Sequence, residues 1–263
     1  MNTFKFKGIS INDYEGNGKP LIFIHAYPLC SRMWDDQVSY FKDKFRVITY
    51  DIRGLGYSNE LSDYQFTMED LVNDLFSIMD EMKLGKANVC GLSVGGYILL
   101  RALVRDSNRF SSVILADTKS EGEDNESLIG RSKMIMDLKT DNKDKVLNEF
   151  LKKLISEESY KNEKLRSFIE TMMSWMDVKG LCAVLMAIAT RTSTLFELKK
   201  TDVPALIIAG KLDAVTPPVR SYYMNENLKN SVFNIIPAAG HLSNMEAPEE
   251  FNKAVEKFLL NLG

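Results

Sequence analysis

The feature that most constrains this chain is a Gly-x-Ser-x-Gly sequence between an apolar run and a second, longer apolar run. Residues 87–90 are typical of the end of a buried strand, and residues 94–104 of a helix buried on most faces. Ser93 lies between Gly91 and Gly95, where a Cβ would crowd a tight strand-to-helix turn. Such a turn lifts the serine hydroxyl clear of the backbone, close to the free N–H groups of the next helix. The pattern predicts an accessible nucleophile, or more simply a glycine-rich turn that lets a helix pack on a sheet.

Apolar runs alternate with helical patterns on both sides of this turn. Strands are predicted at residues 4–6, 9–14, 21–25, 45–50, 87–90, 112–116, 203–209 and 232–236. Helices are predicted at residues 31–42, from residue 67 to about 82, at 94–104 and at 247–260. Thr67 and Asp70 have the spacing of a capping box, which marks one helix start. Strands that alternate with helices predict an α/β fold, a mostly parallel sheet covered by helices on both faces.

The alternation stops between residues 119 and 201, where no buried strand is evident. Helices are expected there at residues 132–138, 145–155, 159–176 and 178–189. We therefore expect a core formed by residues 1–118 and 202–263 and a helical cap of residues 119–201. Six of the thirteen methionines lie in this cap. Methionines at helical spacing are typical of core packing; the alternative is an adaptable apolar roof over a pocket.

Composition excludes several classes of function. The net charge of −3 gives no basic footprint for nucleic acid. No apolar run reaches the roughly 18 residues of a membrane helix, and the N-terminal residues lack the apolar run of a secretory signal. Three scattered cysteines do not predict a disulfide framework or a zinc site. We expect a cytoplasmic protein with no metal, no cofactor and no membrane partner, and the sequence leaves open whether it forms a homo-oligomer.

Three polar residues follow predicted strands. Ser93, Asp213 and His241 each lie just after such a strand, at the edge where open α/β sheets place their sites. His241 is the only histidine after Ser93. Ser…Asp…His is the chain order of a hydrolase triad, in which the histidine takes the serine proton and the aspartate orients the histidine. Asp117 also ends a strand and is an alternative acid.

Five motifs spread over the predicted core carry a family resemblance. They are His25-Ala26-Tyr27-Pro28-Leu29, Tyr50-Asp51-Ile52-Arg53-Gly54-Leu55-Gly56-Tyr57-Ser58, Gly91-Leu92-Ser93-Val94-Gly95-Gly96, Gly210-Lys211-Leu212-Asp213 and Gly240-His241. The chain resembles the α/β-hydrolase superfamily, and within it small bacterial esterases and 3-oxoadipate enol-lactonase-like hydrolases. The helical insertion is similar to the cap of that family, which roofs the substrate pocket.

The resemblance implies roles for further residues. The backbone N–H groups of Tyr27 and Val94 would form an oxyanion hole. Ala26 stands where the family usually has glycine, so its Cβ would narrow the pocket or tilt this loop. His25 is expected to brace the loop and not to act as a base. The expected pocket residues are Ala26, Trp34, Met134, Met172, Met173, Trp175 and Met186.

The predicted function is a serine hydrolase that cleaves a small carboxylic ester or lactone through an acyl-enzyme. One alternative is cofactor-free perhydrolysis or another acyl transfer, because peroxide can intercept the same acyl-enzyme. A second alternative is a hydrolase fold that binds a ligand without catalysis, since fold does not fix function. The expected partner is a small-molecule ester or lactone, and neither nucleic acid nor a membrane.

Overall fold

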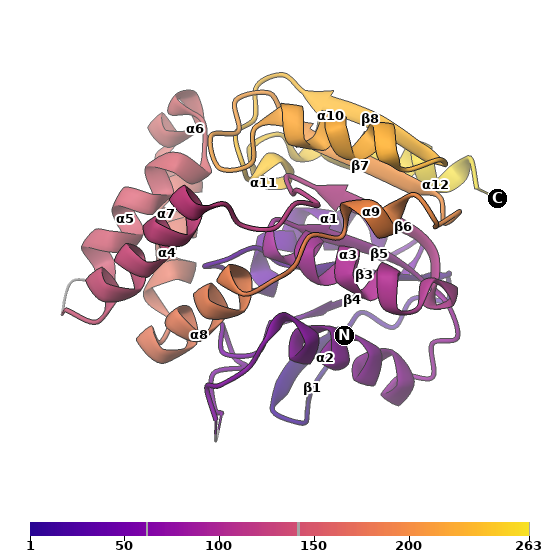
Figure 1. The fold of residues 1–263 in the computed structure, drawn as a ribbon. Coiled ribbons are helices and arrows are strands. Elements are labelled where there is room, and N and C mark those ends of the chain that lie inside the picture. The colour runs from indigo at the N-terminus through magenta and orange to yellow at the C-terminus, as the bar shows by residue number, and fades with distance from the viewer. Residues whose placement is uncertain (62, 141–142, 263) are drawn as a thin grey trace.

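The computed structural model describes residues 1–61, 63–140 and 143–262, and in this part of the chain eight strands form one sheet (Figure 1). The strands are β1 (Asn2–Phe6), β2 (Ile9–Asp13), β3 (Pro20–Ile24), β4 (Arg46–Tyr50), β5 (Ala87–Leu92), β6 (Phe110–Ala116), β7 (Ala205–Gly210) and β8 (Ser231–Ile236). Their order across the sheet is β1-β2-β4-β3-β5-β6-β7-β8. The β1–β2 and β2–β4 pairs are antiparallel, and the other pairs are parallel. The expected α/β class with a mostly parallel sheet is confirmed.

The central strands are buried on both faces. All six residues of β5 are buried, as are the last four of β3, which pairs with β5 so that Leu21 lies opposite Asn88. A strand covered by helices on both sides has no polar face, which explains why these segments are continuous apolar runs in the sequence. The edge strand β8 shows the contrast, because only Ile236 of its six residues is buried.

Helices cover both faces of the sheet. They are α1 (Asp35–Phe41), α2 (Met68–Glu81), α3 (Val94–Arg105), α4 (Asn125–Leu138), α5 (Lys143–Leu154), α6 (Glu157–Lys161), α7 (Glu163–Ser174), α8 (Val178–Ala189), α9 (Leu195–Leu198), α10 (Pro218–Asn227), α11 (Ser243–Glu246) and α12 (Pro248–Leu260). Two 3₁₀ turns, η1 (Ser31–Trp34) and η2 (Ser107–Arg109), precede α1 and β6. Helices α2, α3 and α10 lie on the face nearer the viewer in Figure 1, and α1 packs with α12 behind the sheet.

Two of the predicted helices need comment. The predicted helix at residues 159–176 is two helices, α6 and α7, because Asn162 between them caps the start of α7 by accepting from Leu165 N. The predicted capping box of α2 is present, since the Asp70 carboxylate accepts from Thr67 N at 2.8 Å. Within the described residues no single helix is long and apolar enough to cross a membrane, and the pair α7 and α8 reaches that length only across a 96° bend.

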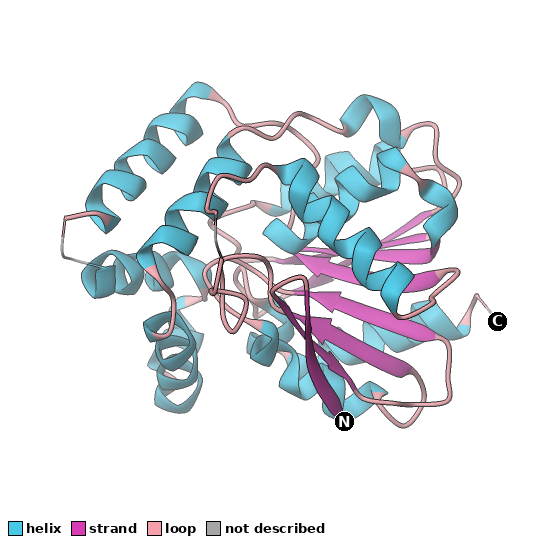
Figure 2. Ribbon diagram, turned by 90° about the horizontal axis from the view of Figure 1, so that it is seen from below, coloured by secondary structure: helices cyan, strands magenta, loops and turns pink. Residues whose placement is uncertain are grey.

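Helices α4 to α8, between β6 and β7, gather beyond one end of the sheet, whereas the short α9 packs beside α10 (Figure 1). In Figure 2 the heads of the central strands point toward this group, so the cap faces the carboxyl ends of the parallel strands. The chain enters and leaves the group side by side, because Thr194 N donates to Ser120 O at 2.9 Å. A second contact joins α8 to the core, where a Cβ on Gly180 would collide with the Gly54 carbonyl oxygen. The expected boundaries at residues 119 and 201 stay predictions.

Candidate active site

Ser93 occupies a strained turn between β5 and α3. Its φ of 55° and ψ of −114° are unusual for a residue with a side chain. A Cβ on Gly91 would collide with the Gly95 carbonyl oxygen, and one on Gly95 with the Ile24 carbonyl oxygen. Both glycines are therefore required by close backbone contacts, as the spacing predicts. The turn presents the Ser93 hydroxyl at the edge of the sheet that faces the cap.

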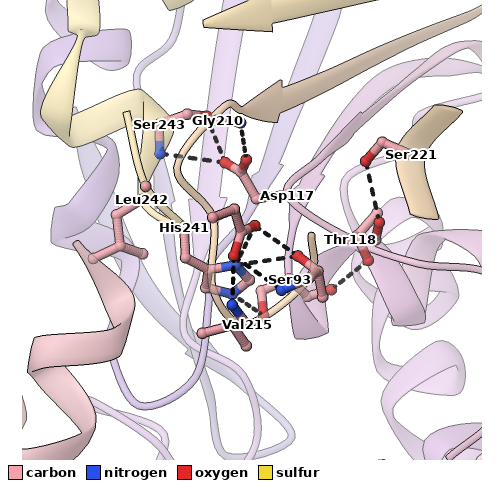
Figure 3. Close-up of polar contacts among 12 residues, drawn as sticks. Ser93, Asp117, Thr118, Gly210, Val215, Ser221, His241, Leu242 and Ser243 are labelled. Carbon is pink, nitrogen blue, oxygen red and sulfur yellow. Dashed lines mark hydrogen bonds and ion pairs between the residues drawn. The ribbon is translucent and has the colours of Figure 1, made fainter. Parts of the chain in front are cut away.

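His241 connects Ser93 to Asp213 (Figure 3). Its Nε2 lies 2.8 Å from Ser93 Oγ, and its Nδ1 lies 2.8 Å from Asp213 Oδ2. Thr216 Oγ1 donates to the same carboxylate oxygen at 2.8 Å, and the Val215 and Thr216 N–H groups donate to the other at 2.7 and 2.9 Å. The carboxylate is thereby held with one oxygen toward the ring. The structure thus brings together the three residues that the sequence singles out.

Burial and charge act in opposite directions on this pair. Burial lowers the pKa of His241, but the charge and hydrogen bond of Asp213 outweigh it, so the pKa lies above its ordinary value of 6.5. Burial likewise raises the pKa of Asp213, but His241 and the Thr216 hydrogen bonds outweigh it and leave the pKa below its ordinary value. Asp213 is therefore suited to stay ionised beside an imidazole that gains a proton.

Asp117 lies near Ser93, His241 and Asp213 but has no hydrogen bond to the histidine ring. Its Oδ1 accepts from Gly210 N at 2.7 Å, and its Oδ2 accepts from Ser243 N at 3.2 Å and from Ser243 Oγ at 2.5 Å (Figure 3). Burial, and then the charge of Asp213, raise the pKa of Asp117 to about 8. Between the two candidate acids, the structure places Asp213 and not Asp117 at the His241 ring.

Sequence reasoning missed three residues that hold the site. Thr216 and Ser243 fix the two aspartates, as described above. Glu246 holds the loop of His241, because its carboxylate accepts from Gly240 N at 2.8 Å and Leu242 N at 3.2 Å. The same carboxylate accepts from Ser156 N of the cap at 2.8 Å. Only Thr216, three residues after Asp213, has a local spacing that predicts such a contact.

The expected oxyanion hole is built from two short segments. Val94 is the first residue of α3, so its N–H has no carbonyl one turn earlier to bond. The Tyr27 N–H donates to no acceptor among the described residues. Ala26, at the position where glycine is usual, is fully buried, and its N–H donates to Met33 Sδ at 3.1 Å. The geometry leaves both N–H groups free to bind an oxygen, and their role stays a prediction.

Hydrogen bonds of the His25 side chain hold the loop that carries Tyr27. His25 donates from Nδ1 to Ala26 O at 2.9 Å, and its Nε2 accepts from Ile52 N at 2.8 Å. Both ring nitrogens are therefore occupied, so His25 cannot serve as a base for Ser93. Asp51 fixes the adjoining loop by accepting from Ser31 N and Tyr57 N, both at 2.7 Å.

The expected pocket residues have different surroundings. Trp34 is fully buried, and its ring centre lies 4.8 Å from that of Phe23 of β3 and 5.9 Å from that of Phe251 of α12. This packing favours a structural role, and the pocket role expected for Trp34 stays a prediction. The methionines at 172 and 173 are buried within the cap, and Met134 is half-buried. Trp175 and Met186 are 39% and 50% exposed.

A groove of about 540 Å³ lies between the cap and residues 64–67. It is lined by Met186, Cys182, Ile135 and Phe66, among others. Burial, and then the charge of the Cys182 thiol, raise the pKa of the Tyr27 hydroxyl. The Tyr27 hydroxyl is buried and has no hydrogen-bond partner among the described residues. Among the described residues, no group of three or more His, Cys, Asp or Glu side chains could hold a metal ion.

Comparison with known proteins identifies the class. The α/β hydrolase fold family matches residues 19–140, and a family described as TAP-like protein matches residues 166–263. The chain belongs to the α/β-hydrolase superfamily. It is 28% identical to 3-oxoadipate enol-lactonase 1 of Acinetobacter baylyi, over 98% of this chain and 94% of that protein.

Two solved structures extend the comparison. A thermophilic esterase from Thermogutta terrifontis, solved with malate bound, is 29% identical and superposes with a TM-score of 0.91 over 97% of this chain and 93% of its own. A bromoperoxidase from Bacillus anthracis is 26% identical, with a TM-score of 0.85 over 95% of both chains. The names of the esterase and the lactonase describe hydrolases, in agreement with the predicted class of reaction.

Proposed function

We propose that this protein is a serine hydrolase that cleaves a small carboxylic ester or lactone through an acyl-enzyme. The row of two 2.8 Å contacts from Ser93 through His241 to Asp213 supports this proposal. In the first step Ser93 Oγ attacks the carbonyl carbon while His241 Nε2 takes its proton. His241 then gives this proton to the departing alkoxide oxygen as the C–O bond breaks. Water repeats the sequence on the acyl-enzyme and releases the acid.

The N–H groups of Tyr27 and Val94 are proposed to bind the oxyanion that forms in each step. Donors that are already in place when the charge develops need no reorganisation, and one such donor contributes on the order of 10²–10³ in rate. The start of α3 adds its partial positive charge at the same point. This proposal needs only backbone groups, so it tolerates Ala26 in place of glycine.

The groove between the cap and residues 64–67 is the proposed path for the acyl chain. Its walls are apolar at Met186, Ile135 and Phe66, which suits a hydrocarbon chain. The lactonase and esterase among the relatives favour an ester or a lactone over an amide. A methionine in the wall adapts to chains of different length.

Perhydrolysis is the second candidate, supported by the similarity to a bromoperoxidase. Hydrogen peroxide in place of water would attack the same acyl-enzyme and give a peracid, with the same proton transfers by His241. The two candidates differ only in which nucleophile the acyl-enzyme accepts.

A panel of p-nitrophenyl esters and simple lactones tests the proposal with Ser93→Ala beside the parent enzyme. We expect Ser93→Ala to lose activity on the order of 10⁴-fold or more and to keep its fold. Ser221→Ala is the matched control, because Ser221 is another buried serine and its Oγ has only a 3.5 Å contact to Thr118 O. A folded Ser93→Ala that keeps most activity would contradict the serine mechanism. Added peroxide then shows whether peracid or carboxylic acid is the main product.

A further inference from the structure

A second cavity lies beside Tyr97, one turn of α3 after Ser93. Its volume is about 280 Å³, and none of the triad residues lines it. Its walls come from the start of α2, from α3 and from the two crossings between core and cap; they are Thr67, Met68, Glu69, Tyr97, Leu100, Arg101, Lys119, Ser120, Thr190, Arg191, Thr192 and Thr194. We call it the hinge cavity, because Ser120 and Thr194 hold the two crossings together there.

The hinge cavity has more positive than negative charge in its walls. Arg101, Lys119 and Arg191 line it, and Glu69 is the one carboxylate in its lining. Arg101 already pairs with Glu69. The Lys119 ammonium is 3.7 Å from its nearest carboxylate, Glu123. Two cations therefore face the cavity without a full partner of their own.

Arg191 is the more unusual of the two. Its side chain is 5% exposed, and its guanidinium lies 3.9 Å from the centre of the Tyr97 ring. Arg191 Nη2 is 3.0 Å from Glu123 Oε1, but neither Nη1 nor Nη2 has a hydrogen-bond partner among the described residues. Burying such donors without an acceptor is unfavourable, so the site is incomplete as it stands.

Glu123 carries one negative charge for three neighbouring cations. The same oxygen, Oε1, lies 3.1 Å from Arg131, 3.0 Å from Arg191 and 3.7 Å from Lys119. Burial lowers the pKa of Lys119, and Arg191 and Arg131 lower it further against the opposing charge of Glu123. A further anion would relieve this excess of positive charge.

We propose that the hinge cavity binds a small organic acid, with its carboxylate held by Lys119 and Arg191. The side chains of Met68 and Leu100 in the same walls suit a short hydrocarbon chain on that acid. A volume of about 280 Å³ is large enough for such an acid. Since Lys119 and Arg191 belong to the two crossings, the bound acid also links the entry of the cap to its exit. This site is separate from Ser93 and does not rest on the proposed hydrolysis.

Calorimetric titration of the Ser93→Ala protein with pentanoate tests the proposal, because turnover plays no part in the measurement. We expect saturable binding that pentanamide, the neutral analogue, does not show. Lys119→Gln in the same background should weaken pentanoate binding about tenfold or more, as a charge-assisted contact is lost. Lys152→Gln is the matched control, since it removes the same charge from an exposed lysine of the cap and should leave binding unchanged.

Three results would overturn the proposal. They are no binding of pentanoate by the Ser93→Ala protein, equal binding of pentanamide, or equal affinity in the Lys119→Gln and Lys152→Gln proteins. Arg191→Lys provides a second variant, which keeps a buried positive charge beside Glu123. Because lysine lacks the fixed donors of the guanidinium, this variant should bind pentanoate more weakly than the parent. Circular dichroism and thermal unfolding of each variant establish that the fold is retained.

Discussion

Ser243, two residues after His241, places its Oγ 2.5 Å from Asp117 Oδ2. The other oxygen of Asp117 accepts from Gly210 N, three residues before Asp213. One carboxylate at the end of β6 thus joins the loop of the proposed base to the loop of the proposed acid. Asp117 links these two loops without a hydrogen bond to the histidine ring, so we expect it to be a positioning residue.

The two aspartates should respond differently to the same substitution. Asp213→Asn should lower kcat on p-nitrophenyl acetate by about 10⁴-fold, because an amide at this position favours the wrong tautomer of His241. Asp117→Asn should cost at most about 10²-fold, the effect of a small displacement, together with about 1–3 kcal/mol of unfolding free energy. Steady-state kinetics and urea denaturation measure the two effects. A larger loss of kcat in Asp117→Asn than in Asp213→Asn would reverse the assignment.

The pH dependence follows from the raised pKa of His241. The ring must be neutral to take the Ser93 proton, so kcat/KM should fall as the pH drops through a pKa above 6.5. In the Asp213→Asn protein this fall of kcat/KM on the acid side should occur at lower pH. The carboxylate charge that most favours the protonated His241 ring is absent there. A pH–rate profile of both proteins checks this prediction. If kcat/KM falls at the same pH in both, a group other than His241 controls the acid side of the profile.

The groove residues should control acyl length. Met186→Ala should change the ratio of activity on p-nitrophenyl hexanoate and acetate by about tenfold, because only the longer chain reaches this wall. Met136→Ala is the control, since Met136 is a methionine of the same cap that is 68% exposed and does not line the groove. Equal ratios in the two variants would show that Met186 has no part in the pocket.

Trp34 should matter for stability and not for specificity. Trp34→Ala removes a fully buried ring between Phe23 and Phe251, which should lower the free energy of unfolding by about 3–5 kcal/mol. The ratio of activities on long and short acyl esters should stay that of the parent. Chemical denaturation and the same ester pair provide both measurements, and a shifted ratio would place Trp34 in the pocket after all.

The elements that sequence predicts well are those with a local cause. The turn at Ser93 follows from Gly91 and Gly95, and the central strands follow from burial on both faces. Helix α10 has no such local signal, and the sequence pattern does not predict it. Its Tyr222 and Tyr223 are exposed, whereas its Ser221 is buried. Its polar and apolar positions do not form the stripe that indicates an amphipathic helix.

The site depends on contacts that spacing cannot determine. Asp117 and Asp213 both end parallel strands, and only the three-dimensional distance to His241 separates their roles. Trp34 and Glu246 are positioned by packing against segments more than 80 residues away in the chain, such as Phe251 for the one and Ser156 for the other. Long-range contacts of this kind leave no periodic signal in the sequence.

The pairing of Ser120 with Thr194 has a consequence for how such a protein diversifies. Strands β6 and β7 are neighbours in the sheet, so the whole excursion between them departs from and returns to one place. A cap transplanted from a relative has to match the chain at those two crossings and at a few further contacts, such as Gly180 with Gly54 and Ser156 with Glu246. Recombination or design can therefore exchange the roof, and with it the molecules admitted, while Ser93 and its supporting strands keep their sequence.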